Sequence, residues 1–289
     1  MISPETVRDV IDRTGGFPVL CSHRGGGSDF APENTMYSFR KSVHYGVRLL
    51  ELDITYTKDM QLVIVHWPFV DACTNGSGWV ANYTLRELKE LDAAYHYRKL
   101  KGTGITIPTL KEFLDEFSQK KDLLFMFDFK DVISLTLTMA LIRDHYSHLE
   151  GRYILGSVLS EPNRLLNVYY DSRLIPICTD ITETFKITIL YFLGLLDHYA
   201  LEHSLYGFIL LPITRPFFTK GLVEALHKRD CMVLVTGSEL NKRETVEQCL
   251  SYGVEFLMTD RPDVYQRLIR DKPLLEKPSL HHVKQKYGL

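Results

Sequence analysis

The sequence predicts an α/β protein built as a single (β/α)8 barrel. The chain has 289 residues, of which 45% are hydrophobic, and one such barrel typically needs about 250 residues. Short, mostly continuous apolar runs recur eight times between helical patterns, as is typical of parallel strands that are covered on both faces. An open, doubly wound sheet is the competing architecture, but eight strand–helix units favour closure into a barrel.

The expected strands run through most of the chain. They are residues Pro18–His23, Leu49–Ile54, Leu123–Phe129, Tyr153–Val158, Leu174–Cys178, Tyr206–Leu211, Cys231–Thr236 and Glu255–Thr259. Among the expected helices, two begin at Thr84 and Thr109, because each threonine stands three residues before a glutamate in the spacing of a capping box. We expect the barrel domain to span residues 1–271, with an irregular tail at 272–289.

Two segments interrupt the alternation of strands and helices. Residues 67–108 form a long connection that we expect to be loop structure over one end of the barrel. The segment Phe185–Leu196 is apolar in nearly all directions around a helix, so it is either buried all round or exposed to something apolar. We expect a short helix near the barrel mouth that either packs into the core or contacts a lipid chain or membrane interface.

Composition limits the partners and the cellular location. A formal net charge of −2 gives no electrostatic reason to expect nucleic acid as a partner. The five cysteines include no CxxC pair, which favours a reducing compartment. The first five residues, Met-Ile-Ser-Pro-Glu, include polar and charged residues, and the longest apolar run has ten residues, so we expect neither a signal peptide nor a membrane span. We therefore expect a cytoplasmic protein, with peripheral membrane contact through Phe185–Leu196 as the alternative.

Charged side chains collect where the first two expected strands end. His23 and Arg24 end the first strand and are followed by three glycines, which allow close backbone approach to a ligand. Chemistry in a barrel lies at the carboxyl ends of its strands. Glu51 and Asp53 lie on the same side of the second strand because strand side chains alternate. Two acids among apolar neighbours need a partner, and a hard divalent cation is a good candidate.

A hairpin brings a second histidine to this acid pair. Residues 53–56 and 62–66 read as two strands joined by a turn that centres between Asp59 and Met60. In that register Asp53 faces His66. The hairpin arm must stand outside the barrel for the count of eight strands to hold.

The third expected strand adds another acid and another cation. Asp128 and Lys130 alternate with apolar residues and point into the barrel mouth. Metal and phosphate together are the natural ligand of such a rim. The acids would hold the cation, Arg24 and Lys130 would hold phosphate oxygens, and the histidines would move protons.

These residues resemble the glycerophosphodiester phosphodiesterase family. The matching motifs are His23-Arg24-Gly25, Pro32-Glu33-Asn34-Thr35, Glu51-Leu52-Asp53, Thr57-Lys58-Asp59, His66, Asp128-Phe129-Lys130 and Thr259-Asp260-Arg261-Pro262. Their order and spacing match throughout residues 18 to 263.

The resemblance implies a barrel enzyme that binds one divalent cation, Mg²⁺ or Ca²⁺, through Glu51, Asp53 and Asp128. It implies that His23 and His66 form the general acid/base pair, that Arg24 and Lys130 contact the phosphate, and that Glu33 and Asn34 support the site. The implied reaction is hydrolysis of glycerophosphodiesters to glycerol 3-phosphate and an alcohol. Some eukaryotic members act instead on lysophospholipids and release lysophosphatidic acid.

Three departures from the family pattern bear on the substrate. The family usually has His-Asp where this chain has His66-Trp67, more often has Glu where this chain has Asp128, and has Trp-Thr-Val-Asn where this chain has residues 235–238. The last change removes an aromatic expected to line the substrate pocket. Three functions stay open: hydrolysis of soluble glycerophosphodiesters, lysophospholipase D activity at a membrane surface, and a non-catalytic barrel that binds phosphoesters.

Overall fold

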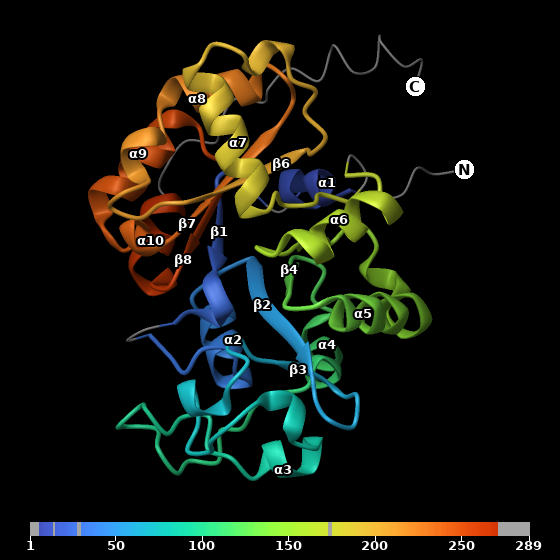
Figure 1. Ribbon diagram of the computed structural model, residues 1–289. Helices are drawn as coiled ribbons and strands as arrows, with labels where there is room; N and C mark the ends of the chain where they lie inside the picture. The colour runs from blue at the N-terminus through green and yellow to red at the C-terminus, as the bar shows by residue number, and fades with distance from the viewer. Residues whose placement is uncertain (1–5, 14, 28–29, 173–174, 271–289) are drawn as a thin grey trace.

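The fold is a curled parallel sheet of seven strands with helices around it (Figure 1). The computed structural model describes residues 6–13, 15–27, 30–172 and 175–270. The expected tail at 272–289 and Leu174 of the expected fifth strand lie outside the described residues. Among the described residues, no helix combines the length and apolar character that crossing a bilayer requires.

Strands and helices alternate along the chain as expected. The strands are β1 (Val19–Ser22), β2 (Leu49–Tyr56), β3 (Leu62–Ile64), β4 (Leu124–Phe129), β5 (Tyr153–Gly156), β6 (Leu205–Ile209), β7 (Met232–Thr236) and β8 (Phe256–Thr259). The helices are α1 (Val7–Arg13), α2 (Met36–His44), α3 (Leu85–Lys89), α4 (Leu110–Phe117), α5 (Val132–His145), α6 (Ser160–Tyr169), α7 (Ile181–Phe192), α8 (Lys220–His227), α9 (Arg243–Tyr252) and α10 (Pro262–Arg270). Capping boxes open α3 at Thr84 and α4 at Thr109, which confirms both expected helix starts.

The parallel sheet has the order β5-β4-β2-β1-β8-β7-β6, with β3 antiparallel to β2 beside it. Pairing of the first strand with the last, β1 with β8, is the mark of a sheet that curls toward closure. Between β5 and β6 the expected fifth strand is reduced to single bridges, Leu155 to Ile177 and Cys178 to Leu205. Pro176 precedes these bridges and has no N–H to donate to a ladder.

Alternation along each strand separates two cores. Leu50, Leu52 and Ile54 of β2 face the surrounding helices, whereas Leu49 faces the barrel interior. Val10 and Ile11 of α1 pack into the same interior cluster and close the amino-terminal end of the barrel. The interior positions toward the other end of β2, Glu51 and Asp53, are acidic and buried. Apolar filling therefore occupies one end of the barrel, and polar chemistry occupies the other.

Residues 65–108 form an insertion with a small core of its own. Val70, Val80, Leu88 and Ile107 are buried there together with Val63 of β3. The expectation of loop structure is thus right for most of this segment, which is irregular apart from α3 and the short 3-10 turns at Val70–Ala72 and Val80–Asn82. Figure 1 shows the insertion at one end of the molecule, with α7 and α8 at the other.

Candidate active site

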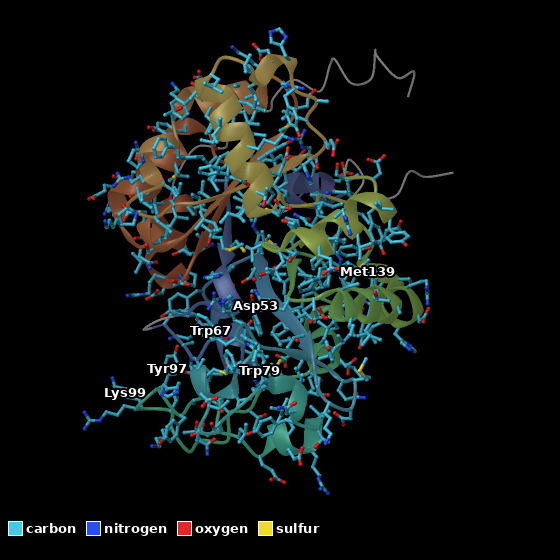
Figure 2. All side chains as sticks on the ribbon, in the orientation of Figure 1. Asp53, Trp67, Trp79, Tyr97, Lys99 and Met139 are labelled. Carbon is cyan, nitrogen blue, oxygen red and sulfur yellow. The ribbon has the colours of Figure 1, made fainter. Side chains whose placement is uncertain are left out.

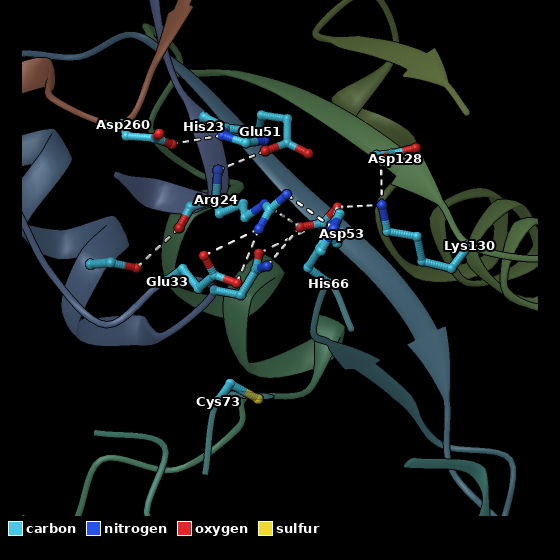
Figure 3. Close-up of polar contacts among 12 residues, drawn as sticks. His23, Arg24, Glu33, Glu51, Asp53, His66, Cys73, Asp128, Lys130 and Asp260 are labelled. Carbon is cyan, nitrogen blue, oxygen red and sulfur yellow. Dashed lines mark hydrogen bonds and ion pairs between the residues drawn. The ribbon is translucent and has the colours of Figure 1, made fainter. Parts of the chain in front are cut away.

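The site lies at the carboxyl ends of β1, β2, β4 and β8 (Figure 3). Alternation puts Glu51 and Asp53 of β2 and Asp128 of β4 on the interior face. The register of the two strands brings the acids together, since Asp53 pairs directly with Asp128 in the parallel ladder. One oxygen from each of the three carboxylates lies within 4.8 Å of the others.

This three-acid cluster has the properties of a divalent cation site. Burial raises the pKa of Glu51 to about 8, and the charges of Asp53 and Asp128 add to that effect. Burial also raises the pKa of Asp128, and its Oδ1 is buried with no hydrogen-bond partner among the described residues. Three oxygen donors and an unpartnered buried oxygen fit a hard cation, which would neutralise acids that are costly to ionise together.

Lys130 balances two of these acids. Its Nζ lies 2.6 Å from Asp53 Oδ1 and 2.6 Å from Asp128 Oδ2. Burial alone would lower the pKa of this ammonium group, but the two carboxylates outweigh that effect and raise it. Burial would likewise raise the pKa of Asp53, yet Lys130, His66 and Arg24 hold it well below its usual value. Asp53 is therefore the member of the cluster that its neighbours most favour in the ionised form.

Arg24 joins the cluster to the loop before α2. Its backbone N–H donates to Glu51 Oε2 at 2.6 Å, and its guanidinium donates from Nη1 to both oxygens of Glu33, at 3.1 and 3.2 Å. Arg24 has a left-handed backbone, with φ 55°, which costs about 1–3 kcal/mol for a non-glycine residue. Asn34 holds this turn by donating its backbone N–H to Arg24 O and its Nδ2 to Asp53 Oδ2.

His66 lies against the same carboxylate. Its Nδ1 is 2.9 Å from Asp53 Oδ1, and its Nε2 is 3.0 Å from Arg24 Nη2. A guanidinium can only donate, so Nε2 accepts and the ring proton is on Nδ1, which donates to Asp53. The hairpin thus supplies a histidine of defined tautomer to the acid cluster.

The register expected for this hairpin was wrong by one residue. Ile54 pairs with Ile64 and Tyr56 with Leu62, so Asp53 stands opposite Val65 rather than His66. The turn contains three residues because Met60 has φ 59°, the left-handed position of a three-residue hairpin loop. Since β3 ends at Ile64, the chain bends after it and His66 still reaches Asp53.

Asp260 belongs to the site, although from the sequence we predicted no role for it. It follows β8 directly, and its Oδ1 lies 2.7 Å from Nδ1 of His23, which follows the neighbouring strand β1. Burial lowers the pKa of His23, but the hydrogen bond to Asp260 and the charge of Glu51 outweigh burial and raise it. Gly27 leaves room for this contact, since a Cβ there would lie 3.2 Å from Asp260 Oδ1. Its position after the last strand was the available signal.

Eight of the nine residues expected at the site are thus joined by hydrogen bonds and ion pairs, and the ninth, His23, pairs with Asp260 beside them. The chain matches the model of the glycerophosphoryl diester phosphodiesterase family over residues 23–264. The protein belongs to this family. Its members are glycerophosphodiester phosphodiesterases, so the chain is an enzyme of that class.

Proteins of similar sequence include glycerophosphodiester phosphodiesterases. A glycerophosphodiester phosphodiesterase of Caldanaerobacter subterraneus is 29% identical over 87% of this chain and 98% of that protein. Glycerophosphodiester phosphodiesterase 1 of the mouse is 38% identical over a shorter match, which covers 38% of this chain and 33% of that protein.

Solved structures confirm the barrel. A phosphodiesterase of Oleispira antarctica, described in complex with the product sn-glycerol 3-phosphate, has a TM-score of 0.69 at 21% identity and covers 87% of this chain and 96% of its own. A glycerophosphoryl diester phosphodiesterase domain from Mycobacterium tuberculosis has a TM-score of 0.71 at 18% identity, covering 87% of this chain and 99% of its own.

The departures from the family pattern have clear structural positions. Trp67 is exposed and stands edge-on to His66, with ring centroids 4.7 Å apart. Val235 of β7, where the family has tryptophan, is fully buried. Val235 packs in the core between the sheet and the surrounding helices, so its side chain does not face the mouth of this phosphodiesterase.

Proposed function

We propose that this protein hydrolyses glycerophosphodiesters to glycerol 3-phosphate and an alcohol with the help of one divalent cation. The observation that carries the proposal is the three-acid cluster with two histidines beside it, each hydrogen-bonded to a carboxylate: His23 to Asp260 and His66 to Asp53. Carboxylate-bound cations and positioned histidines are the groups that phosphodiester hydrolysis needs.

Glu51, Asp53 and Asp128 are the residues that would hold the cation. Oxygen ligands without a thiolate favour Mg²⁺ or Ca²⁺. When bound, the cation supplies Lewis-acid polarisation of a phosphoryl oxygen. Lys130 and Arg24 would hold phosphate oxygens, because their cationic groups lie beside Asp53, where the phosphate would bind with the cation. His23 and His66 would move protons to and from the reacting oxygens.

Turnover of glycerophosphocholine tests this function. With Mg²⁺ or Ca²⁺ supplied, we expect glycerol 3-phosphate and choline to appear, as followed by phosphorus NMR, and excess chelator to stop the reaction. Asp53→Asn should abolish turnover. Binding of glycerophosphocholine without turnover under either metal would favour the non-catalytic phosphoester-binding barrel.

A second candidate, lysophospholipid hydrolysis at a membrane surface, is favoured by α7. The helix carries an exposed apolar stripe: Phe185 has 66% of its surface exposed, Ile181, Ile189 and Phe192 are exposed as well, and Leu193, which follows the helix, is 64% exposed. Phe192 also contacts Phe217, with ring centroids 6.0 Å apart, in the loop that follows β6 at the mouth end of the barrel. Only Ile187 of the helix is fully buried, so the exposed apolar face fits an acyl chain or lipid interface.

Replacing both Phe192 and Leu193 with serine separates the two candidates. If α7 meets lipid, activity on lysophosphatidylcholine vesicles or micelles should fall several-fold while glycerophosphocholine turnover holds. The double change Val168→Ser and Tyr169→Ser on α6 is the matched control, since both side chains are exposed on another helix. Equal loss on both substrates together with a lower melting temperature would remove the lipid interpretation.

A further inference from the structure

The insertion exposes three large aromatic side chains next to the candidate active site. Trp67, Phe69 and Trp79 have 45%, 40% and 53% of their surfaces exposed. We call them the aromatic shelf. Figure 2 shows Trp67 and Trp79 on the insertion, below Asp53 in the view. A group of exposed aromatic side chains beside a catalytic site is typical of a ligand-binding or interaction surface.

The shelf is fixed in place by backbone pairing. Phe69 and Trp79 form an antiparallel bridge, Val80 N–H donates to Pro68 O at 2.8 Å, and Val70 N–H donates to Gly78 O at 2.9 Å. The rings of Phe69 and Trp79 lie 4.2 Å apart between centroids. The shelf therefore does not need to form when a ligand arrives.

Contacts within the site connect the shelf to the chemistry. The Trp67 ring stands edge-on to His66, whose Nδ1 contacts Asp53. Cys73, on the same insertion, lies near Glu33 (Figure 3), and burial together with the Glu33 charge raises the pKa of its thiol to about 12. A substrate whose phosphate lies at the acid cluster would thus extend one of its two ester groups over the shelf.

One carboxylate lies directly beside the shelf. The Asp71 carboxylate accepts the Gly78 backbone N–H at 2.7 Å, directly beside Trp79, and this hydrogen bond lowers the pKa of Asp71. On the side of the active site the Glu33 carboxylate is balanced by the Arg24 guanidinium, so Asp71 is the anionic group of the shelf. Aromatic faces combined with anionic groups attract large, weakly hydrated cations.

We propose that the aromatic shelf binds the quaternary ammonium group of a choline phosphodiester. The inference rests on the proposed phosphodiesterase function and deepens it by naming the class of alcohol. Glycerophosphocholine and lysophosphatidylcholine both carry this group, so the shelf serves either substrate.

Fluorescence tests binding without turnover. The chain has two tryptophans, both on the shelf, so intrinsic tryptophan emission reports on this surface alone. Phosphocholine, a monoester that offers no diester to cleave, should quench or shift the emission in the presence of Mg²⁺. Phosphoethanolamine, which lacks the methyl groups, should do so only at much higher concentration. Equal responses to the two compounds, or none to either, would overturn the proposal.

Kinetics tests the same surface on substrates. Trp79→Ala should raise KM for glycerophosphocholine by about 2- to 30-fold and leave KM for glycerophosphoglycerol unchanged, while Trp79→Phe should retain most of the preference. Trp67→Ala should raise KM for glycerophosphocholine by more than it raises KM for glycerophosphoglycerol. Tyr95→Ala is the matched control, because Tyr95 is an exposed aromatic of the insertion whose ring is covered by Lys101 Nζ at 3.9 Å.

The outcomes separate the alternatives. The same KM changes on lysophosphatidylcholine would show that the lipid carries the recognised head group, and changes confined to glycerophosphocholine would identify the soluble diester. Parallel loss on choline and glycerol diesters would overturn the shelf as a choline site. Emission shifts with choline-free phosphatidylglycerol vesicles, without any response to phosphocholine, would make the shelf a membrane contact instead. Phosphocholine binding without any diester turnover would overturn the proposed function alone.

Discussion

At the scale of single residues, each candidate catalytic histidine is hydrogen-bonded to a carboxylate. The His66–Asp53 pair joins residues 13 apart, whereas the His23–Asp260 pair joins residues 237 apart. The sequence could predict the first pair because a hairpin links its members. The second depends on β8 lying beside β1, which only the closing sheet provides. The sequence motif includes Asp260, but it could not predict that Asp260 is hydrogen-bonded to His23.

Removing either histidine should stop catalysis while the fold persists. We expect His23→Ala and His66→Ala each to lower kcat by about 10²- to 10⁴-fold, the usual contribution of a positioned acid or base. Both side chains are partly exposed, at 26% and 22%, so the melting temperature should change little. Near wild-type rates in one variant would take that histidine out of the mechanism.

Asp260 should act through His23. Asp260→Asn keeps the shape of the side chain but removes its charge, and we expect kcat to fall by about 10- to 100-fold, on the scale of a charged hydrogen bond, with KM unchanged. The double variant His23→Ala/Asp260→Asn should be no slower than His23→Ala alone. Additive losses in that cycle would mean that Asp260 acts independently of His23.

At the scale of elements, periodicity predicted the strands well and their pairing details less well. Seven of the expected strands are present with ends shifted by a few residues. The fifth is reduced to bridges at Ile177 and Cys178. The hairpin register depended on one residue, Met60, which has a left-handed backbone conformation. Nothing in the local sequence predicts that conformation. Such conformations are set by the context of the turn, which residue type alone does not fix.

The junction of α8 with β8 carries a pH-dependent contact away from the active site. His227, in the last turn of α8, lies 3.1 Å from the Glu255 carboxylate, which precedes β8. The hydrogen bond to Glu255 raises the pKa of His227 in the folded state. Its stabilisation is therefore fully present below about pH 6.5, the usual unfolded value, and is lost as pH rises through the folded value.

Urea unfolding of wild type and His227→Gln between pH 5.5 and 8.5 measures this contribution. The free energy of unfolding of the wild type should exceed that of the variant most at the acidic end of this range. The difference there should be about 1 kcal/mol, a small value because the pair is partly exposed, and it should shrink toward alkaline pH. A gap that is constant or widens with pH would show that His227 is neutral in the folded protein.

At the scale of the whole molecule, the barrel separates stability from chemistry. Apolar side chains and α1 fill its amino-terminal end, so the carboxyl end can hold five carboxylates, namely Glu33, Glu51, Asp53, Asp128 and Asp260, beside the two fixed cations Arg24 and Lys130. That excess of negative charge is partly buried and is costly without a counter-ion. The enzyme class, the barrel fold and the acid cluster could all be predicted from the sequence, because motif spacing and the alternation of side chains along strands determine them.

The central claim is that Glu51, Asp53 and Asp128 hold one divalent cation on which turnover depends. Calorimetric titration of the metal-free protein with Mg²⁺ or Ca²⁺, run beside glycerophosphocholine turnover at each metal concentration, tests it most directly. We expect a single site per chain, recovery of activity in parallel with its occupancy, and loss of both in Asp53→Asn while the variant stays folded. Full turnover by metal-free protein, or unaltered metal binding by Asp53→Asn, would contradict the account.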